Sequence, residues 1–171
     1  MSKVKKEFMN IQLDWLIEEV KLRGEPMPKT IIFCNTLKDI ASVVNLLLMK
    51  LGKHIYIPVG SMDRKYFVIG IFHSVSWPKY KEHLLDEFKQ KTSKKRIVVA
   101  SSAHSMGVNF PDVRYVINWG PGRTLLDQLQ EAGLAGRDGE LSHVITIYHG
   151  HQLSHCITKL QDAIASQFTC R

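Results

Sequence analysis

The sequence predicts an α/β domain in which helices cover both faces of a mostly parallel sheet, giving three layers. Short runs of β-branched and other apolar residues alternate along the chain with longer segments whose apolar residues recur at helical spacing. That alternation is typical of βαβ units with right-handed crossovers. The strand-like runs are almost continuously apolar, as expected of strands buried on both faces. The 171 residues are enough for one such domain.

The amino-terminal third contains the clearest helix signals. Apolar residues at helical spacing predict a helix over residues 8–23, and the run Gly-Glu-Pro-Met-Pro at 24–28 ends it as a linker. A buried strand is expected at 30–34. Thr36 then lies at the N-cap position of a helix over 37–51, with Gly52 at its C′ position. Residues 1–28 are therefore predicted to form a helix and linker, and residues 29–171 the domain.

The remaining elements follow the same alternation. Strands are expected at 54–57, 67–72, 97–100, 113–117 and 144–148, and helices at 78–91, from 124 onward, and after the last strand through 168. In an open parallel sheet, ligands bind at the loops that follow the carboxyl ends of strands. Three loops qualify here: Asn35-Thr36, residues 101–109, and residues 120–124.

The positive charge lies in the first part of the chain. Residues 1–96 hold 18 basic and 10 acidic side chains, against 5 and 6 in residues 97–171. A basic half suggests a polyanionic partner such as nucleic acid, because phosphate neutralisation releases counterions. The start of the chain has no apolar segment typical of a secretory signal, no apolar stretch is long enough to span a bilayer, and three scattered cysteines argue against a disulfide scaffold. An intracellular protein without a membrane partner is expected.

Two common nucleotide-binding motifs are absent from the sequence. The turn at 120–124 has Leu125 where the dinucleotide fingerprint G-x-G-x-x-G needs its third glycine. The Gly52-Lys53 pair has Leu47 and His54 where a P-loop needs glycine and a hydroxyl residue. The chain by itself is therefore not expected to hold a nucleoside triphosphate with Mg²⁺ in the usual way.

Residues 130–139, Gln-Glu-Ala-Gly-Leu-Ala-Gly-Arg-Asp-Gly, form the most specific stretch. Two glycines three residues apart leave the backbone without side chains at these positions. The arginine that follows them places a guanidinium at a helix end. A planar, permanently charged fork suits a γ-phosphate presented by another surface. The alternative is a helix C-cap followed by an ordinary surface arginine.

The order of these segments resembles the second, RecA-like lobe of superfamily 2 helicases. The amino-acid sequences of the segments are similar to the motifs of the RecQ-like DNA helicases. Residues 31–36 look like motif IV, residues 98–114 like motif V, and residues 130–139 like motif VI, whose family pattern is Q-x-x-G-R-x-G-R-D-G. His73-Ser74 resembles the family's histidine-small dipeptide. Cys170-Arg171 matches the Cys-Arg pair that begins the family's zinc-binding subdomain.

The resemblance implies a role for this domain and for individual residues in it. It implies a RecA-like fold that supplies motifs IV to VI to an ATP-dependent 3′–5′ DNA helicase, acting on single-stranded or partly duplex DNA in the nucleus. A first RecA-like lobe of the same protein would hold most of the ATP and Mg²⁺. The implied catalytic residues are Arg137, as the arginine finger, and Gln130. Nucleotide contacts are implied for Gly107, Asn109 and Gly136, nucleic-acid contacts for Asn35, Thr36, Ser101 and Ser102, and a zinc ligand for Cys170.

The sequence departs from the family pattern at two informative positions. Leu134 stands where motif VI has its first arginine, and Asn109 where motif V commonly has aspartate. These departures keep an alternative open, namely a catalytically degraded, helicase-derived module that binds DNA or protein. They also suggest that arginine at position 134 would raise ATP hydrolysis. The three tryptophans Trp15, Trp77 and Trp119 are interpreted as packing residues.

Overall fold

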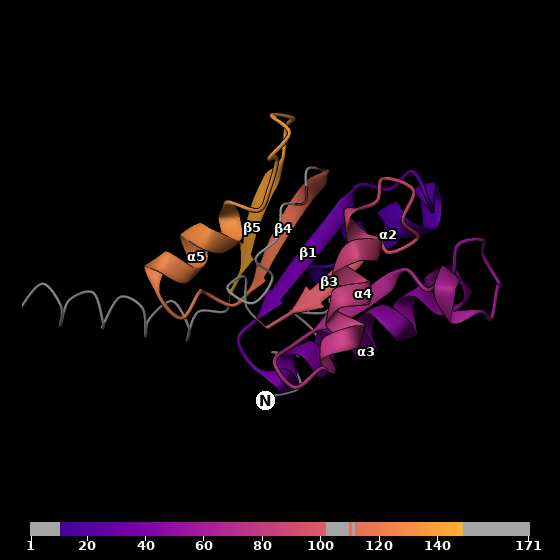
Figure 1. Cartoon of the computed structure of the whole chain (residues 1–171), viewed down its shortest axis with the longest axis horizontal. Coiled ribbons are helices and arrows are strands. Elements are labelled where there is room, and N and C mark those ends of the chain that lie inside the picture. The colour runs from indigo at the N-terminus through magenta and orange to yellow at the C-terminus, as the bar shows by residue number, and fades with distance from the viewer. Residues whose placement is uncertain (1–10, 102–109, 111, 149–171) are drawn as a thin grey trace, which may run out of the picture.

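The computed structural model describes residues 11–101, 110 and 112–148. Its centre is a five-stranded sheet with the strand order β2-β3-β1-β4-β5, in which every neighbouring pair is parallel (Figure 1). The strands are β1 (Lys29–Cys34), β2 (Ile69–Phe72), β3 (Ile97–Ala100), β4 (Val113–Trp119) and β5 (His143–Ile147). All carboxyl ends therefore meet at one edge of the sheet.

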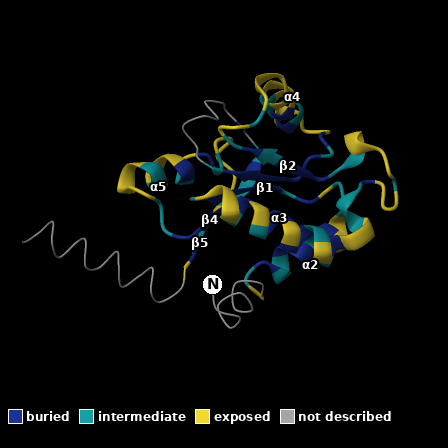
Figure 2. Ribbon diagram, turned by 90° about the horizontal axis from the view of Figure 1, so that it is seen from below, coloured by how far each residue is buried: buried dark blue, intermediate teal, exposed yellow. Residues whose placement is uncertain are grey.

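Helices cover both faces of this sheet, as predicted. The helices are α2 (Asp14–Arg23), α3 (Leu37–Leu51), α4 (Pro78–Lys89) and α5 (Leu125–Ala132). The apolar sides of α2 and α3 share one buried cluster with β1, β3 and β4, whereas α4 packs into a second cluster on the opposite face (Figure 2). The three-layer α/β prediction is confirmed.

The predicted helix boundaries are accounted for by their capping residues. The Thr36 hydroxyl accepts a hydrogen bond from the Asp39 amide at 3.1 Å, which fixes the first turn of α3. Thr124 does the same for Asp127 at 3.0 Å and starts α5. Gly52, with a positive φ of 52°, ends α3 as expected.

The strand predicted at 54–57 is wrong. Residues Gly52–Ile55 form a short 3-10 helix, and only Tyr56 makes an isolated antiparallel bridge, to Phe67. The apolar pattern there has another cause: Ile57 is buried, and Ile55 packs against the same α2–α3 cluster. Core packing of an irregular segment thus produced a strand-like sequence. The strand predicted over 67–72 begins later, at Ile69.

A buried lysine joins three elements at the amino-terminal edge of the sheet. Lys29 Nζ donates to the backbone carbonyls of Phe88 and Gln90 at 2.6 and 2.9 Å and pairs with Asp112 at 2.8 Å. It thereby satisfies carbonyls at the end of α4, which otherwise lack intrahelical donors. Burial lowers the pKa of Lys29, while Asp112 opposes that shift. This contact fixes where the chain enters β4.

The amino-terminal helix packs on the domain. Trp15 of α2 lies 4.9 Å, between ring centroids, from Tyr115 of β4, and Leu16 is fully buried in the α2–α3 cluster. The boundary after residue 28 stays a prediction, and the helix predicted through residue 168 lies outside the described residues. In the described part of the chain, every helix falls short of the length and apolarity that crossing a membrane requires.

Candidate functional site

Three loops lie in a row at the carboxyl edge of the sheet. Because the strand order is β2-β3-β1, the loops after these strands are neighbours, and the Ser101 amide donates to the Phe72 carbonyl at 3.0 Å. Asn35 and Ser101, from the loops after β1 and β3, line a small cavity of about 30 Å³. The structure therefore brings together two of the residues to which the resemblance gives nucleic-acid contacts.

The same cavity is completed by three residues that the sequence analysis did not single out. Arg123, Asp127 and Glu131 line it from the start of α5 and the turn before it. They recur every four residues, so they share one face of the helix. The four-residue spacing could have shown from the sequence that these side chains share a helix face. It could not have shown that this face is turned toward the loops after β1 and β3.

Asn35 and Thr36 both have structural partners. The Asn35 side-chain amide donates to the Pro121 carbonyl at 2.8 Å, and the Arg123 guanidinium donates to the Asn35 carbonyl. These bonds join the end of β1 to the turn after β4. The Thr36 hydroxyl caps α3. Thr36 is nevertheless exposed at this edge.

Glu131 is the strongly perturbed acid of this cluster. Burial raises the pKa of its carboxyl from the ordinary 4.5 to about 7, with a further rise from nearby Asp127 and an opposing effect of Arg123. The Glu131 residue is 8% exposed. The acid is therefore only partly ionised near neutral pH.

Glu131→Gln is expected to remove a pH dependence of stability. The unfolded chain loses this proton near pH 4.5 and the folded chain near pH 7, so rising pH destabilises the fold between these values. Glutamine stays neutral and should raise the unfolding midpoint relative to wild type at about pH 8, with convergence toward about pH 4.5. Thermal unfolding across this range measures it. Glu140→Gln, at an exposed carboxyl, is the control, and a constant difference between Glu131→Gln and wild type contradicts the prediction.

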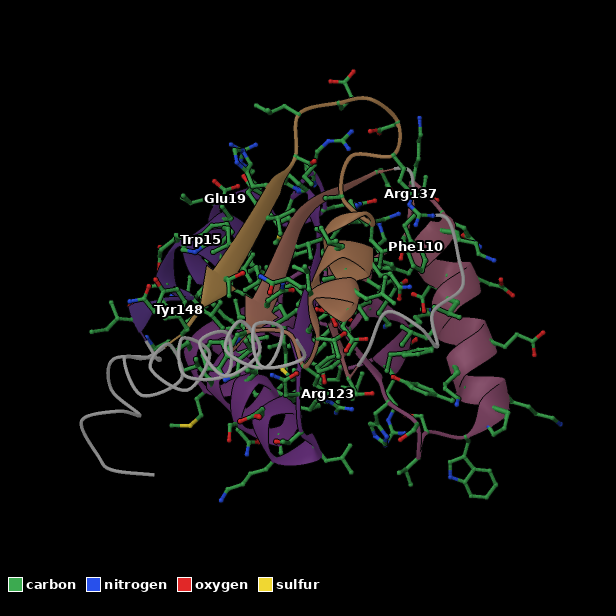
Figure 3. The ribbon with its side chains drawn as sticks, turned by 90° about the vertical axis from the view of Figure 1, so that its left-hand side faces the viewer. Trp15, Glu19, Phe110, Arg123, Arg137 and Tyr148 are labelled. Carbon is green, nitrogen blue, oxygen red and sulfur yellow. The ribbon has the colours of Figure 1, made fainter. Side chains whose placement is uncertain are left out.

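Arg137 lies near the opposite end of α5. The Gly136 amide donates to the carbonyl of Val113, the first residue of β4, at 3.0 Å, whereas Arg123 contacts the end of β1. Figure 3 shows Arg123 and Arg137 at opposite ends of the sheet. Gln130 is exposed on α5 between them. Arg137 is thus separated from the carboxyl-edge loops, whereas Gln130 is the sequence neighbour of Glu131, which lines the cavity.

A tight turn holds Arg137 in place. Asp138 accepts two hydrogen bonds from Arg114, at 3.0 and 2.7 Å, and Arg137 Nε donates to the Gly133 carbonyl at 2.8 Å. Gly136 has a φ of 62°, and a Cβ there would lie 2.5 Å from the Ser142 hydroxyl. Only glycine fits, because an L side chain would be both strained and in collision. The Arg137 side chain is exposed on this fixed backbone.

The contact of Arg137 matches the alternative interpretation, a residue at a helix C-cap. Its Nε bonds a carbonyl just after α5, as a C-capping arginine does. Its exposed guanidinium can still meet an anion brought by another surface. Gly136 serves the turn that positions the arginine.

Leu134 is a core residue. It is 4% exposed and belongs to the same buried cluster as Phe110, Val113 and Val116. The position at which the family pattern has an arginine is therefore filled by an apolar side chain facing inward.

Four predicted site residues, Ser102, Gly107, Asn109 and Cys170, lie outside the described residues. Within residues 11–101, 110 and 112–148, no three His, Cys, Asp or Glu side chains are grouped to hold a metal ion. The acid next to Arg137, Asp138, is engaged by Arg114.

Comparisons with known proteins agree with this architecture. Residues 11–139 match the helicase conserved C-terminal domain family. The chain is 33% identical over 130 residues to a putative ATP-dependent RNA helicase of Acanthamoeba polyphaga mimivirus, covering 72% of this chain and 20% of that protein. It is 41% identical over 59 residues to the RecQ-like DNA helicase BLM of Xenopus laevis, covering 34% of this chain and 4% of that protein.

Further matches extend the comparison. The chain is 30% identical over 118 residues to the mouse (Mus musculus) ATP-dependent DNA helicase Q1, covering 69% of this chain and 16% of that protein. The chain thus spans about a fifth or less of the length of these three relatives. Domain 2 of the DEAD-box helicase Mss116p, bound to an RNA duplex, has a TM-score of 0.64 at 22% identity, covering 83% of this chain and 50% of that chain.

The family match and the strand order define the class of protein. The chain belongs to the helicase C-terminal domain family and is a second motor lobe of a helicase. Its relatives further identify it as a lobe of RecQ-like type.

Proposed function

We propose that this lobe serves an ATP-dependent 3′–5′ DNA helicase by contacting single-stranded or partly duplex DNA at its carboxyl edge and the nucleotide through Arg137. A first RecA-like lobe of the same protein is the partner that holds ATP. The observation that carries the proposal is the exposed Arg137 guanidinium, held by the Gly136–Asp138 turn after α5 and outside the cavity that Asn35 and Ser101 line.

The residues described here fit an accessory role toward the nucleotide. Arg137 supplies a planar cation that can stabilise charge developing on a transferred γ-phosphate. Gln130 lies exposed on α5, which precedes Arg137, and is proposed to contact the nucleotide as well. Gly107 and Asn109 of motif V are proposed nucleotide contacts, and Ser102 a DNA contact beside Ser101. Mg²⁺ would be held mainly by the first lobe, and a zinc site would include Cys170 with ligands from elsewhere.

Two of the four proposed DNA contacts, Asn35 and Thr36, lie in the basic first part of the chain. Residues 1–96 carry the excess of Lys and Arg, and the loops after β1 and β2 belong to that part. Phosphate neutralisation by such side chains makes binding strongly salt-dependent. A nuclear location is part of this proposal.

A second candidate function is supported by Leu134. The first motif VI arginine is replaced by a buried leucine, so a module that binds DNA or protein without hydrolysing ATP is the alternative.

The test is ATP hydrolysis by the complete polypeptide that carries this segment, measured with and without single-stranded DNA. The proposal expects hydrolysis that DNA stimulates, together with DNA binding that weakens steeply between about 50 and 200 mM salt. DNA binding without hydrolysis supports the non-catalytic alternative. Neither binding nor hydrolysis overturns both.

A further inference from the structure

The loop after β2 ends in an exposed tryptophan. Trp77 is 82% exposed, whereas Trp119 is 6% exposed and Trp15 packs on Tyr115. The interpretation of all three tryptophans as packing residues is therefore wrong for Trp77. Val75 is also exposed on the same loop, at 71%. A large apolar ring left in water at a loop beside the candidate site calls for a partner.

The backbone around Trp77 is fixed. The Ser76 amide donates to the His73 carbonyl at 3.0 Å, and the Trp77 carbonyl accepts from the Lys81 amide at 3.0 Å. Pro78 occupies the first turn of α4 and restricts the chain directly after the tryptophan. The ring is therefore displayed from a defined position, which lowers the entropy lost when a partner binds.

The loop carrying Trp77 stands at one end of the row of carboxyl-edge loops. It follows β2, the edge strand, and is adjacent to the Ser101 loop through the bond from Ser101 to Phe72. A strand of nucleic acid that runs along the Asn35 and Ser101 loops would therefore reach Trp77 at the β2 edge.

Two lysines, Lys79 and Lys81, follow Trp77 closely in the chain, and the nearest acid in the sequence is Glu82. Lys79 is exposed in the first turn of α4, and the Lys81 ammonium lies 5.9 Å from the Phe72 ring centroid. An exposed aromatic ring beside lysines is the combination with which proteins bind single strands, because the ring stacks on a base and the cations meet phosphates.

We propose that Trp77 is a stacking platform for an unpaired base of single-stranded nucleic acid, with Lys79 and Lys81 at the flanking phosphates. The proposal rests on the proposed function, since it adds a base contact to the same strand path. A base within a duplex does not offer its face, so the platform selects single strands.

The test uses the full chain and oligothymidylate, with oligouridylate as a second arm. Wild-type tryptophan emission should be quenched on binding, and Trp77→Phe should lose most of that quenching. Trp77→Ala should weaken binding about tenfold, measured by anisotropy of a labelled oligonucleotide, whereas Trp77→Phe should stay within about threefold of wild type. Val75→Ala, an exposed apolar change on the same loop, is the matched control and should bind as wild type does.

A polyanion without bases separates stacking from charge. Heparin should bind wild type and Trp77→Ala equally well. Oligonucleotide binding without quenching, and equal in Trp77→Ala, overturns the stacking platform but leaves the proposed function standing. An affinity loss that Phe does not rescue also overturns it. Binding of oligouridylate alone keeps the platform and contradicts the DNA substrate, and absence of any binding contradicts both proposals.

Discussion

Arg137→Ala is expected to lower the ATP hydrolysis rate of the complete helicase polypeptide about a thousandfold. The guanidinium at this position would stabilise charge on the γ-phosphate in the transition state, and arginine fingers contribute on the order of 10³ or more to such rates. The exposed side chain stands on a turn held by the Arg114–Asp138 pair, so the loss should reach the reaction and leave the fold intact. A steady-state ATPase assay with saturating single-stranded DNA measures it.

Arg137→Lys separates charge from geometry. Lysine keeps the positive charge but loses the planar fork that bonds two phosphate oxygens at once, so its rate should also fall well below wild type. DNA binding by both variants should stay close to wild type, because Arg137 is not among the residues that line the carboxyl-edge cavity with Asn35 and Ser101. Unchanged hydrolysis in Arg137→Ala would mean that this arginine only caps α5 through the Gly133 carbonyl.

Periodicity was sufficient to predict the layers of this fold. Within the described residues, the strand-like runs and the helical segments appear in the predicted order with one exception, because most are long enough for their apolar pattern to be distinctive. The segment at 54–57 is the exception. Its alternating apolar residues face the core from an irregular chain, and a short apolar run cannot distinguish that arrangement from a strand.

The candidate site was less predictable than the fold. The sequence motifs identify Arg137 and Asn35 as candidate site residues. They cannot show that the Asn35 side-chain amide donates to the Pro121 carbonyl. Glu131 was visible as a residue of motif VI, yet its raised pKa arises from burial beside Asp127, which only the three-dimensional packing creates. The sequence predicts Trp77 to be a packing residue because tryptophan is more often buried than exposed. Its exposure depends on the fold and could not be predicted from the sequence.

Leu134→Arg is expected to destabilise the domain by about 4 kcal/mol. The leucine is 4% exposed in the cluster that includes Phe110 and Val116, so an arginine there would bury a charge or force the core open. Urea denaturation of the full chain measures the free energy of unfolding. Leu141→Arg, at a position 79% exposed a few residues further along, should change stability by less than about 0.5 kcal/mol. Leu134→Met, which keeps the volume, should cost less than about 1.5 kcal/mol.

This expectation revises what the sequence alone suggests about position 134. The family pattern predicts that an arginine here would raise ATP hydrolysis, since it would add a second cation to motif VI. The packing predicts that the main effect of the substitution is a loss of core contacts. A gain in ATP hydrolysis would also require the turn at 133–136 to move and expose the new side chain. Leu134→Arg with wild-type stability and faster hydrolysis would show that the turn makes this move at little cost. Reduced stability without a gain in rate would show that the leucine is now part of the fold, and that any surviving hydrolysis depends on Arg137.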